Sequence, residues 1–129
     1  MKTFITEGPG LPAWSAPISH AVVVGNTCYL SGQLSIDADG QYRPGTSGEE
    51  AQRAFQNLDN VLRNAGFTLE DMVFVDIAFI DLDDLPEVNA VFADVFSAGS
   101  RPARTIYQAA CLPYKARIKI TGVAMRAQA

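Results

Sequence analysis

The chain has 129 residues, of which 48% are apolar and 19% charged, so it is long enough to fold as one domain, residues 1–129, around a single core. Its net charge of −4 and the lack of a basic stripe with interleaved aromatic residues make nucleic-acid binding an unfavoured function. No apolar run is long enough to cross a bilayer and the first residues do not resemble a signal peptide, so we expect a soluble, cytoplasmic protein.

The chain begins with a segment that predicts no regular structure. Residues 1–16 include most of the stretch GPGLPAWSAP, whose prolines and glycines indicate an irregular arm with Trp14 as its anchor. The stretch HAVVVGNTCYLSGQ follows, and Gly25-Asn26 separates its two apolar runs. Such a dipeptide is typical of a two-residue hairpin turn. We therefore expect the arm to lead into an antiparallel hairpin, which a loop, SIDADGQYRPGTSG, then leaves.

Two helices are predicted from capping signals and apolar spacing. Ser47 followed by Glu50 matches a capping box, apolar residues then fall on one face, and Gly66 is a natural stop. A second helix is expected to begin near Asp84, with Pro86 in its first turn. Between the two helices, the nearly continuous apolar run MVFVDIAFI predicts a buried strand.

Two further strands, TIYQAACL and ARIKITGVAM, are expected at the C-terminal end. The predicted order is β-β-α-β-α-β-β, which favours an α+β fold with one mixed sheet and both helices packed on one face. The other face of that sheet would carry too many apolar residues to remain exposed to water. We expect neighbouring subunits to cover it.

The charges are distributed unevenly along the chain. The residues after Asp94 contain six of the ten basic residues and none of the 14 acidic ones. Either an anion site lies in this last part or the basic part packs against the acidic part, and the sequence leaves both open. Arg104 is the strongest anion-binding candidate, because it opens a strand after a loop of small residues and its guanidinium can hold a carboxylate with two hydrogen bonds. The alternative is an exposed charge, which suits Arg101 better.

Three other residues are weaker candidates. Lys119 alternates with apolar neighbours and points away from the apolar side of its strand, either into solvent or toward a site. Ser31 and Gly32 end a strand, where a missing side chain lets a ligand approach the backbone, although a bulge is the simpler interpretation. The spacings typical of metal sites are missing and His20 is the single histidine, so we expect neither a metal nor another cofactor.

Three segments of the chain, taken together, resemble a known family. GNTCYLSGQ, AFQNLDNVLRNAGFTLEDMVFVDIAFIDLDDLPEVNAVFADVF and RPARTIYQAACLPYKARIKITGVA are similar to the Rid family of reactive-intermediate deaminases, also called YjgF or L-PSP endoribonuclease-like proteins. The likeness covers residues 17 to 126 and implies a chorismate-mutase-like fold and a homotrimer with ligand clefts between subunits. It also implies a hydrolase that converts imines and enamines, such as 2-aminoacrylate, to a ketoacid and ammonia, with Arg104 holding the carboxylate of a small metabolite.

The chain departs from the best-known active branch of this family at three positions. Ile18 stands where that branch has a tyrosine, and Ile106 stands where it often has a cysteine. Lys119 replaces a glutamate that is thought to orient the attacking water. On this alignment the ligand would contact Arg104, Ile18, Gly32, Ile106 and Tyr107. Carboxylate binding is thus retained, whereas the group that handles water is lost.

Three functions follow from this pattern. The first is a divergent deaminase, in which Arg104 orients the substrate, backbone groups near Ser31 and Gly32 position the reacting centre, and Lys119 takes the place of the glutamate. The second is a non-catalytic binding module for a small carboxylate or ketoacid. The third is an endoribonuclease, which the overall acidity and the lack of a general base disfavour. If Lys119 lay beside Arg104, repulsion could lower the pKa of the lysine, or the pair could bind a dicarboxylate.

Overall fold

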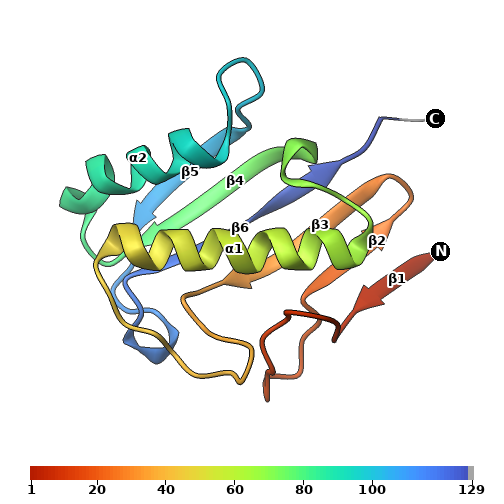
Figure 1. Cartoon of the computed structure of the whole chain (residues 1–129), viewed down its shortest axis with the longest axis horizontal. Coiled ribbons are helices and arrows are strands. Elements are labelled where there is room, and N and C mark those ends of the chain that lie inside the picture. Colours follow the sequence, from red (N-terminus) through yellow and green to blue (C-terminus); the bar gives the residue numbers. More distant parts are fainter. Residues whose placement is uncertain (128–129) are drawn as a thin grey trace.

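A six-stranded mixed sheet covered on one face by two helices forms the protein, as the computed structural model of residues 1–127 describes it (Figure 1). In chain order the elements are β1 (Lys2–Ile5), β2 (Ala21–Val24), β3 (Thr27–Gln33), α1 (Ser47–Ala65), β4 (Met72–Phe79), α2 (Leu85–Val95), β5 (Ala103–Gln108) and β6 (Ile118–Met125). The strand order is β1-β2-β3-β6-β4-β5, in which β4 and β5 are parallel and the other neighbours antiparallel. The predicted α+β fold is confirmed.

The N-terminal arm is less irregular than the sequence predicts. Residues 1–16 were expected to lack regular structure, but Lys2–Ile5 form the edge strand β1, with Phe4 opposite Val22 of β2. This strand has only four residues, which are too few for an alternation of apolar and polar residues to predict it from the sequence. Hydrogen bonding to β2 decides its conformation.

The cap of α1 lies one residue before the predicted one. Thr46 Oγ1 accepts from the backbone N–H of Glu49 at 3.1 Å, and Glu49 Oε1 accepts from the N–H of Thr46 at 2.9 Å. The expected pair of Ser47 and Glu50 is therefore wrong. Ser47 Oγ instead donates to Asp84 Oδ2 at the start of α2, and Glu50 points into the protein.

Glu50 is fully buried and joins three segments. Its Oε2 accepts from the hydroxyl of Tyr42 at 2.5 Å, and its Oε1 accepts from the backbone N–H of Arg117 at 3.0 Å. Desolvation and the carboxylate of Glu50 raise the pKa of Tyr42 to about 12, so this phenol remains a donor at neutral pH. The contacts fasten the loop before α1 and the start of β6 to the helix.

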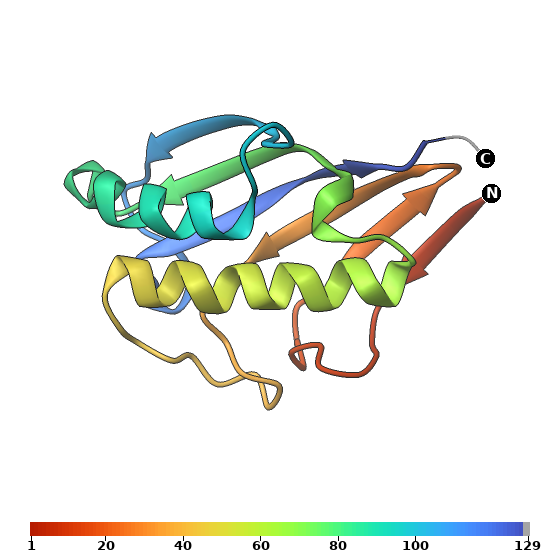
Figure 2. The same cartoon turned by 45° about the horizontal axis from the view of Figure 1, so that its top comes forward.

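The two faces of the sheet differ in what covers them. Both helices lie on one side (Figure 2), where the main core packs. We call the opposite side the open face. It presents an apolar row in register across neighbouring strands, formed by Phe4, Val22, Tyr29, Val123 and Phe74. Phe4 and Tyr29 are each more than half exposed.

The chain leaves the sheet earlier than predicted after β5. The strand ends at Gln108 rather than Leu112, and Gln108 Oε1 accepts from the backbone N–H of Leu82. A short turn, Pro113–Lys115, then leads into β6. None of the helices in the described residues is long and apolar enough to cross a membrane.

Candidate functional site

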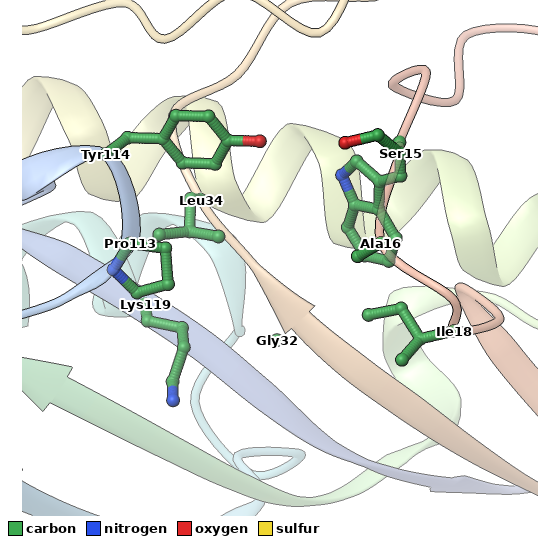
Figure 3. A pocket seen from close by; sticks show the side chains of 9 residues that line it. Ser15, Ala16, Ile18, Gly32, Leu34, Pro113, Tyr114 and Lys119 are labelled. Atoms are coloured by element: carbon green, nitrogen blue, oxygen red, sulfur yellow. The ribbon is translucent and has the colours of Figure 1, made fainter.

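A pocket of about 380 Å³ opens where β3 and β6 approach the N-terminal arm. Its walls come from three parts of the chain: the arm from Trp14 to Ile18, the end of β3 with Gly32 and Leu34, and the turn with Pro113 and Tyr114 next to Lys119 (Figure 3). Most of this surface is carbon. The fold thus brings together Ile18, Gly32 and Lys119, three of the residues singled out from the sequence.

The side chain of Lys119 lies against Gly32. A Cβ atom at position 32 would stand only 2.9 Å from Lys119 Cδ, so the glycine makes room for the lysine. Lys119 is half-buried and forms no ion pair with any described residue. Figure 3 shows its ammonium group pointing away from Tyr114. The pocket therefore has one polar, positively charged end.

Ser31 and Gly32 lie at an irregularity in the sheet. The register between β3 and β6 shifts between Leu30 and Gln33, as expected for a β-bulge. Ser31 donates from Oγ to the carbonyl of Ser19 at 2.6 Å and from its backbone N–H to the carbonyl of His20 at 2.9 Å. The hydroxyl of Ser31 thus ties the arm to the strand, and the bulge turns Gly32 toward the pocket.

His20 supports the wall on the arm side. Its ring is almost fully buried and packs against Trp14, with 3.7 Å between ring centroids and an angle of 31° between the ring planes. Its Nε2 lies 2.9 Å from the carbonyl oxygen of Pro12. Burial lowers the pKa of His20. The neutral ring therefore donates from Nε2 to Pro12 and accepts at Nδ1 from Gln33 Nε2 at 3.4 Å. The single histidine is structural and holds Trp14 in place.

Arg104 lies outside this pocket and on the other face of the sheet. Its Nη1 donates to Asn89 Oδ1 at 2.8 Å, and its guanidinium lies 4.8 Å from the centroid of the Phe92 ring. Both partners belong to α2, whereas Lys119 is on the open face. Within one chain Arg104 and Lys119 do not lie side by side, because alternation along the strands sends the two side chains to opposite faces.

Arg104 has no acidic partner among the described residues, since the ion pairs there involve other side chains. It lines a depression of about 470 Å³ together with Asn89 and Arg101. Arg101 is directed differently, because its Nε donates to the carbonyl of Phe96 at 3.1 Å. The half-buried guanidinium of Arg104 therefore carries an uncompensated charge beside a neutral amide.

Ile106 and Tyr107 do not line the pocket. Ile106 packs against the core beneath the helices, and Tyr107 is exposed on the open face of the edge strand β5. Sequence reasoning missed Tyr114 and Asn89 as site residues. Tyr114 lies in a short turn between two strands, and no local pattern shows that it lines a pocket or that Asn89 faces Arg104. Among the described residues, no group of three or more His, Cys, Asp or Glu side chains could hold a metal ion.

Comparisons with known proteins show the family of this chain. Residues 11–126 match the family model described as Endoribonuclease L-PSP. The chain is 40% identical over 116 residues to a 2-iminobutanoate/2-iminopropanoate deaminase of Bos taurus, covering 89% of this chain and 84% of that protein. The human protein of the same name is 36% identical, with the same coverage.

Solved structures agree as well. RidA from an Antarctic Psychrobacter species superimposes with a TM-score of 0.88 at 33% identity, covering 94% of this chain and 98% of that one. A protein of the Rid family from Yersinia pestis superimposes with a TM-score of 0.91 at 28% identity, covering 98% of this chain and 100% of that one. These neighbours are consistent with the predicted chorismate-mutase-like fold.

Proposed function

The chain belongs to the Rid family, as the sequence resemblance predicted, and on that premise we propose that it hydrolyses an imine or enamine of a small carboxylate-bearing metabolite to a ketoacid and ammonia. The names of relatives at about 40% identity support an imine deaminase. We further propose that the site lies between subunits.

The observation that carries the proposal is the uncompensated charge of Arg104. A half-buried guanidinium with only an amide oxygen and an aromatic ring as partners is suited to receive a carboxylate in a bidentate geometry. The amide of Asn89 accepts from one nitrogen and orients the remaining donors. A substrate carboxylate would neutralise the charge and be held in a fixed direction.

The pocket around Lys119 and the guanidinium of Arg104 lie on opposite faces of the sheet, so they do not face one ligand within a single chain. The apolar row on the open face supports burial against further copies, which would also remove exposed Tyr29 from water. We therefore propose a homotrimer in which Arg104 of one subunit completes the pocket of its neighbour. Closed cyclic symmetry makes all three sites identical.

Hydrolysis of an imine needs little chemical assistance from the protein. Water adds to the carbon of the C=N bond, and the resulting carbinolamine expels ammonia and leaves the ketoacid. Arg104 would hold the carboxylate, and the backbone beside Gly32 would position the reacting carbon. The ammonium of Lys119 can donate hydrogen bonds to the polar head of the substrate but, while protonated, accepts none from water. Positioning and electrostatics would therefore supply most of the catalysis.

The test is a coupled assay in which an amino-acid oxidase generates the imine and ketoacid formation is followed. We expect acceleration by the wild type and a loss of about 100-fold in kcat/KM for Arg104→Ala, because the carboxylate would lose its charged partner. Arg101→Ala is the matched control, since it removes a neighbouring guanidinium that is turned elsewhere. Equal rates for wild type and Arg104→Ala with every imine would refute the proposal.

A non-catalytic binding module is the second candidate, and the lysine at position 119 is the observation that favours it. Without a carboxylate in the pocket, nothing in the lining accepts a proton from water as readily as the family glutamate would. This alternative predicts that 2-ketobutyrate raises the melting temperature of the wild type but not of Arg104→Ala, with no imine hydrolysis. Endoribonuclease activity, which the family description names, has less support because the net charge of the chain is −4.

A further inference from the structure

The turn before β6 holds two residues in an unusual backbone conformation. Tyr114 and Lys115 have φ angles of 61° and 57°, in the left-handed region that residues with a Cβ rarely occupy. Hydrogen bonds from Lys115 N to the Leu112 carbonyl and from Ala116 N to the Pro113 carbonyl hold the turn. Strained backbone of this kind is concentrated at ligand sites.

The consequence of this turn is the position of the Tyr114 ring. It is half exposed and forms a wall of the pocket, facing Ser15 across the opening (Figure 3). The ring is also supported from behind, because it stacks on Tyr42 with 6.4 Å between centroids and Tyr42 is fastened to buried Glu50. Tyr114 is therefore a well-supported aromatic wall rather than a free surface side chain.

The pocket is polar at one end and apolar at the other. The ammonium of Lys119 and the backbone at Gly32 lie at the polar end, whereas Trp14, Leu34 and Tyr114 supply carbon surface elsewhere. The volume of this pocket, about 380 Å³, lies in the range of small-molecule sites and leaves room for a side chain larger than that of a three- or four-carbon acid. A ligand that fits both ends has a charged head and a large apolar tail.

We infer that this pocket selects imines of amino acids with large apolar side chains, aromatic or branched, and that Tyr114 is a specificity-determining residue. The inference rests on the proposed function and adds the class of substrate. The head of the substrate lies at Gly32 and Lys119, and its side chain packs between the arm and the ring of Tyr114. Burial of the apolar side chain supplies the preference.

The kinetic test compares imines generated from phenylalanine, leucine and 2-aminobutyrate. We expect the wild type to have a kcat/KM at least about tenfold higher for the first two. Tyr114→Ala should reduce the phenylalanine-to-aminobutyrate ratio at least about fivefold, whereas Tyr114→Phe, which keeps the ring, should preserve it. Lys115→Ala is the matched control, because it changes the adjacent left-handed residue without touching the pocket lining.

A binding measurement separates this inference from the proposed function. Titration calorimetry should show phenylpyruvate binding about tenfold more tightly than 2-ketobutyrate, and Tyr114→Ala should remove the difference. If no imine is hydrolysed, the proposed function fails, and the calorimetry still decides the side-chain preference. If imines are hydrolysed but 2-iminobutanoate is the best substrate, or if Tyr114→Ala leaves the ratios unchanged, the inference is overturned while the function stands.

Discussion

Two cations define the site at the scale of single residues, and they differ in their surroundings. Arg104 is oriented by the amide of Asn89 and an aromatic ring, whereas Lys119 lies along Gly32 in a largely apolar pocket. Because neither has an acidic partner among the described residues, both remain available for a ligand anion. In the proposed reaction, their separation on opposite faces of one chain gives them different roles.

Replacing Lys119 by glutamate tests whether a water-accepting group is missing. We expect Lys119→Glu to raise kcat for imine hydrolysis at least about tenfold, since a carboxylate can accept a proton from the attacking water. KM should rise as well, because a positive charge that attracts the head of the substrate is lost. Lys119→Met is the control that removes the charge without adding a base. A fall in kcat in both variants would mean that the ammonium itself takes part in the reaction.

The buried His20 predicts a pH dependence of stability. Its pKa in the folded protein is lowered from 6.5 by burial, so the unfolded chain binds more protons below about pH 6.5. Its contribution is fully present above pH 6.5 and is lost as the pH falls toward the folded pKa. We expect the free energy of unfolding, measured in urea from pH 7.5 to 5, to fall more steeply for the wild type than for His20→Gln. Identical slopes would contradict this assignment.

At the scale of elements, both ends of α1 are capped, and its first turn contacts the segments that border the pocket. Its N-terminus is capped by Thr46, and its C-terminus stops at Gly66, whose φ of 86° suits a left-handed cap. The buried face of the helix covers the sheet, and Glu50 in its first turn holds the loop and strand that border the pocket. The stability of the helix and the shape of the site are thus connected.

Removing the Glu50 side chain should show this connection. Glu50→Ala leaves the Tyr42 hydroxyl and the Arg117 N–H without their acceptor, and we expect a loss of about 2–4 kcal/mol in unfolding free energy. Because Tyr42 supports Tyr114, the affinity for phenylpyruvate should fall more than that for 2-ketobutyrate. Gln56→Ala, at an exposed position of the same helix, serves as the control in both urea unfolding and calorimetry. A loss of stability without any change in the relative affinity for the two ketoacids would show that Tyr42 does not support the pocket wall.

At the scale of the whole molecule, the sheet presents one apolar face that the helices do not cover. The row from Phe4 to Phe74 crosses neighbouring strands in register, and its large exposed side chains favour association of copies. Association is also what the proposed function requires, because one chain keeps its arginine and its pocket on opposite faces of the sheet. Assembly and activity should therefore be lost together.

Subunit complementation tests the shared site directly. Arg104→Ala removes one half, and Gly32→Leu removes the other by displacing Lys119. Each variant alone should be inactive, whereas trimers reassembled from an equal mixture should regain activity in about a quarter of their sites. Sedimentation would first establish that both variants form trimers. Mixed trimers without activity would show that the arginine and the pocket do not cooperate across subunits.

The sequence by itself determined the fold class and the family and pointed to some of the candidate residues, because these depend on local patterns: apolar periodicity, turn dipeptides, and short motifs around Gly32 and Arg104. It also predicted that the open face would be apolar. The exact helix cap and the four-residue strand β1 were not predictable, since a neighbouring threonine competes with Ser47 as the cap and β1 depends on pairing with β2.

Only the tertiary structure decided which candidates meet. Tyr114 enters the pocket because a left-handed turn directs it there, Ile106 turns into the core, and Arg104 and Lys119 separate because strand neighbours alternate between faces. Such outcomes depend on contacts between residues far apart in the chain, which no local pattern encodes. The sequence therefore shows which residue types are present to bind a ligand. Their arrangement around that ligand depends on how the sheet, the arm and the turn pack together.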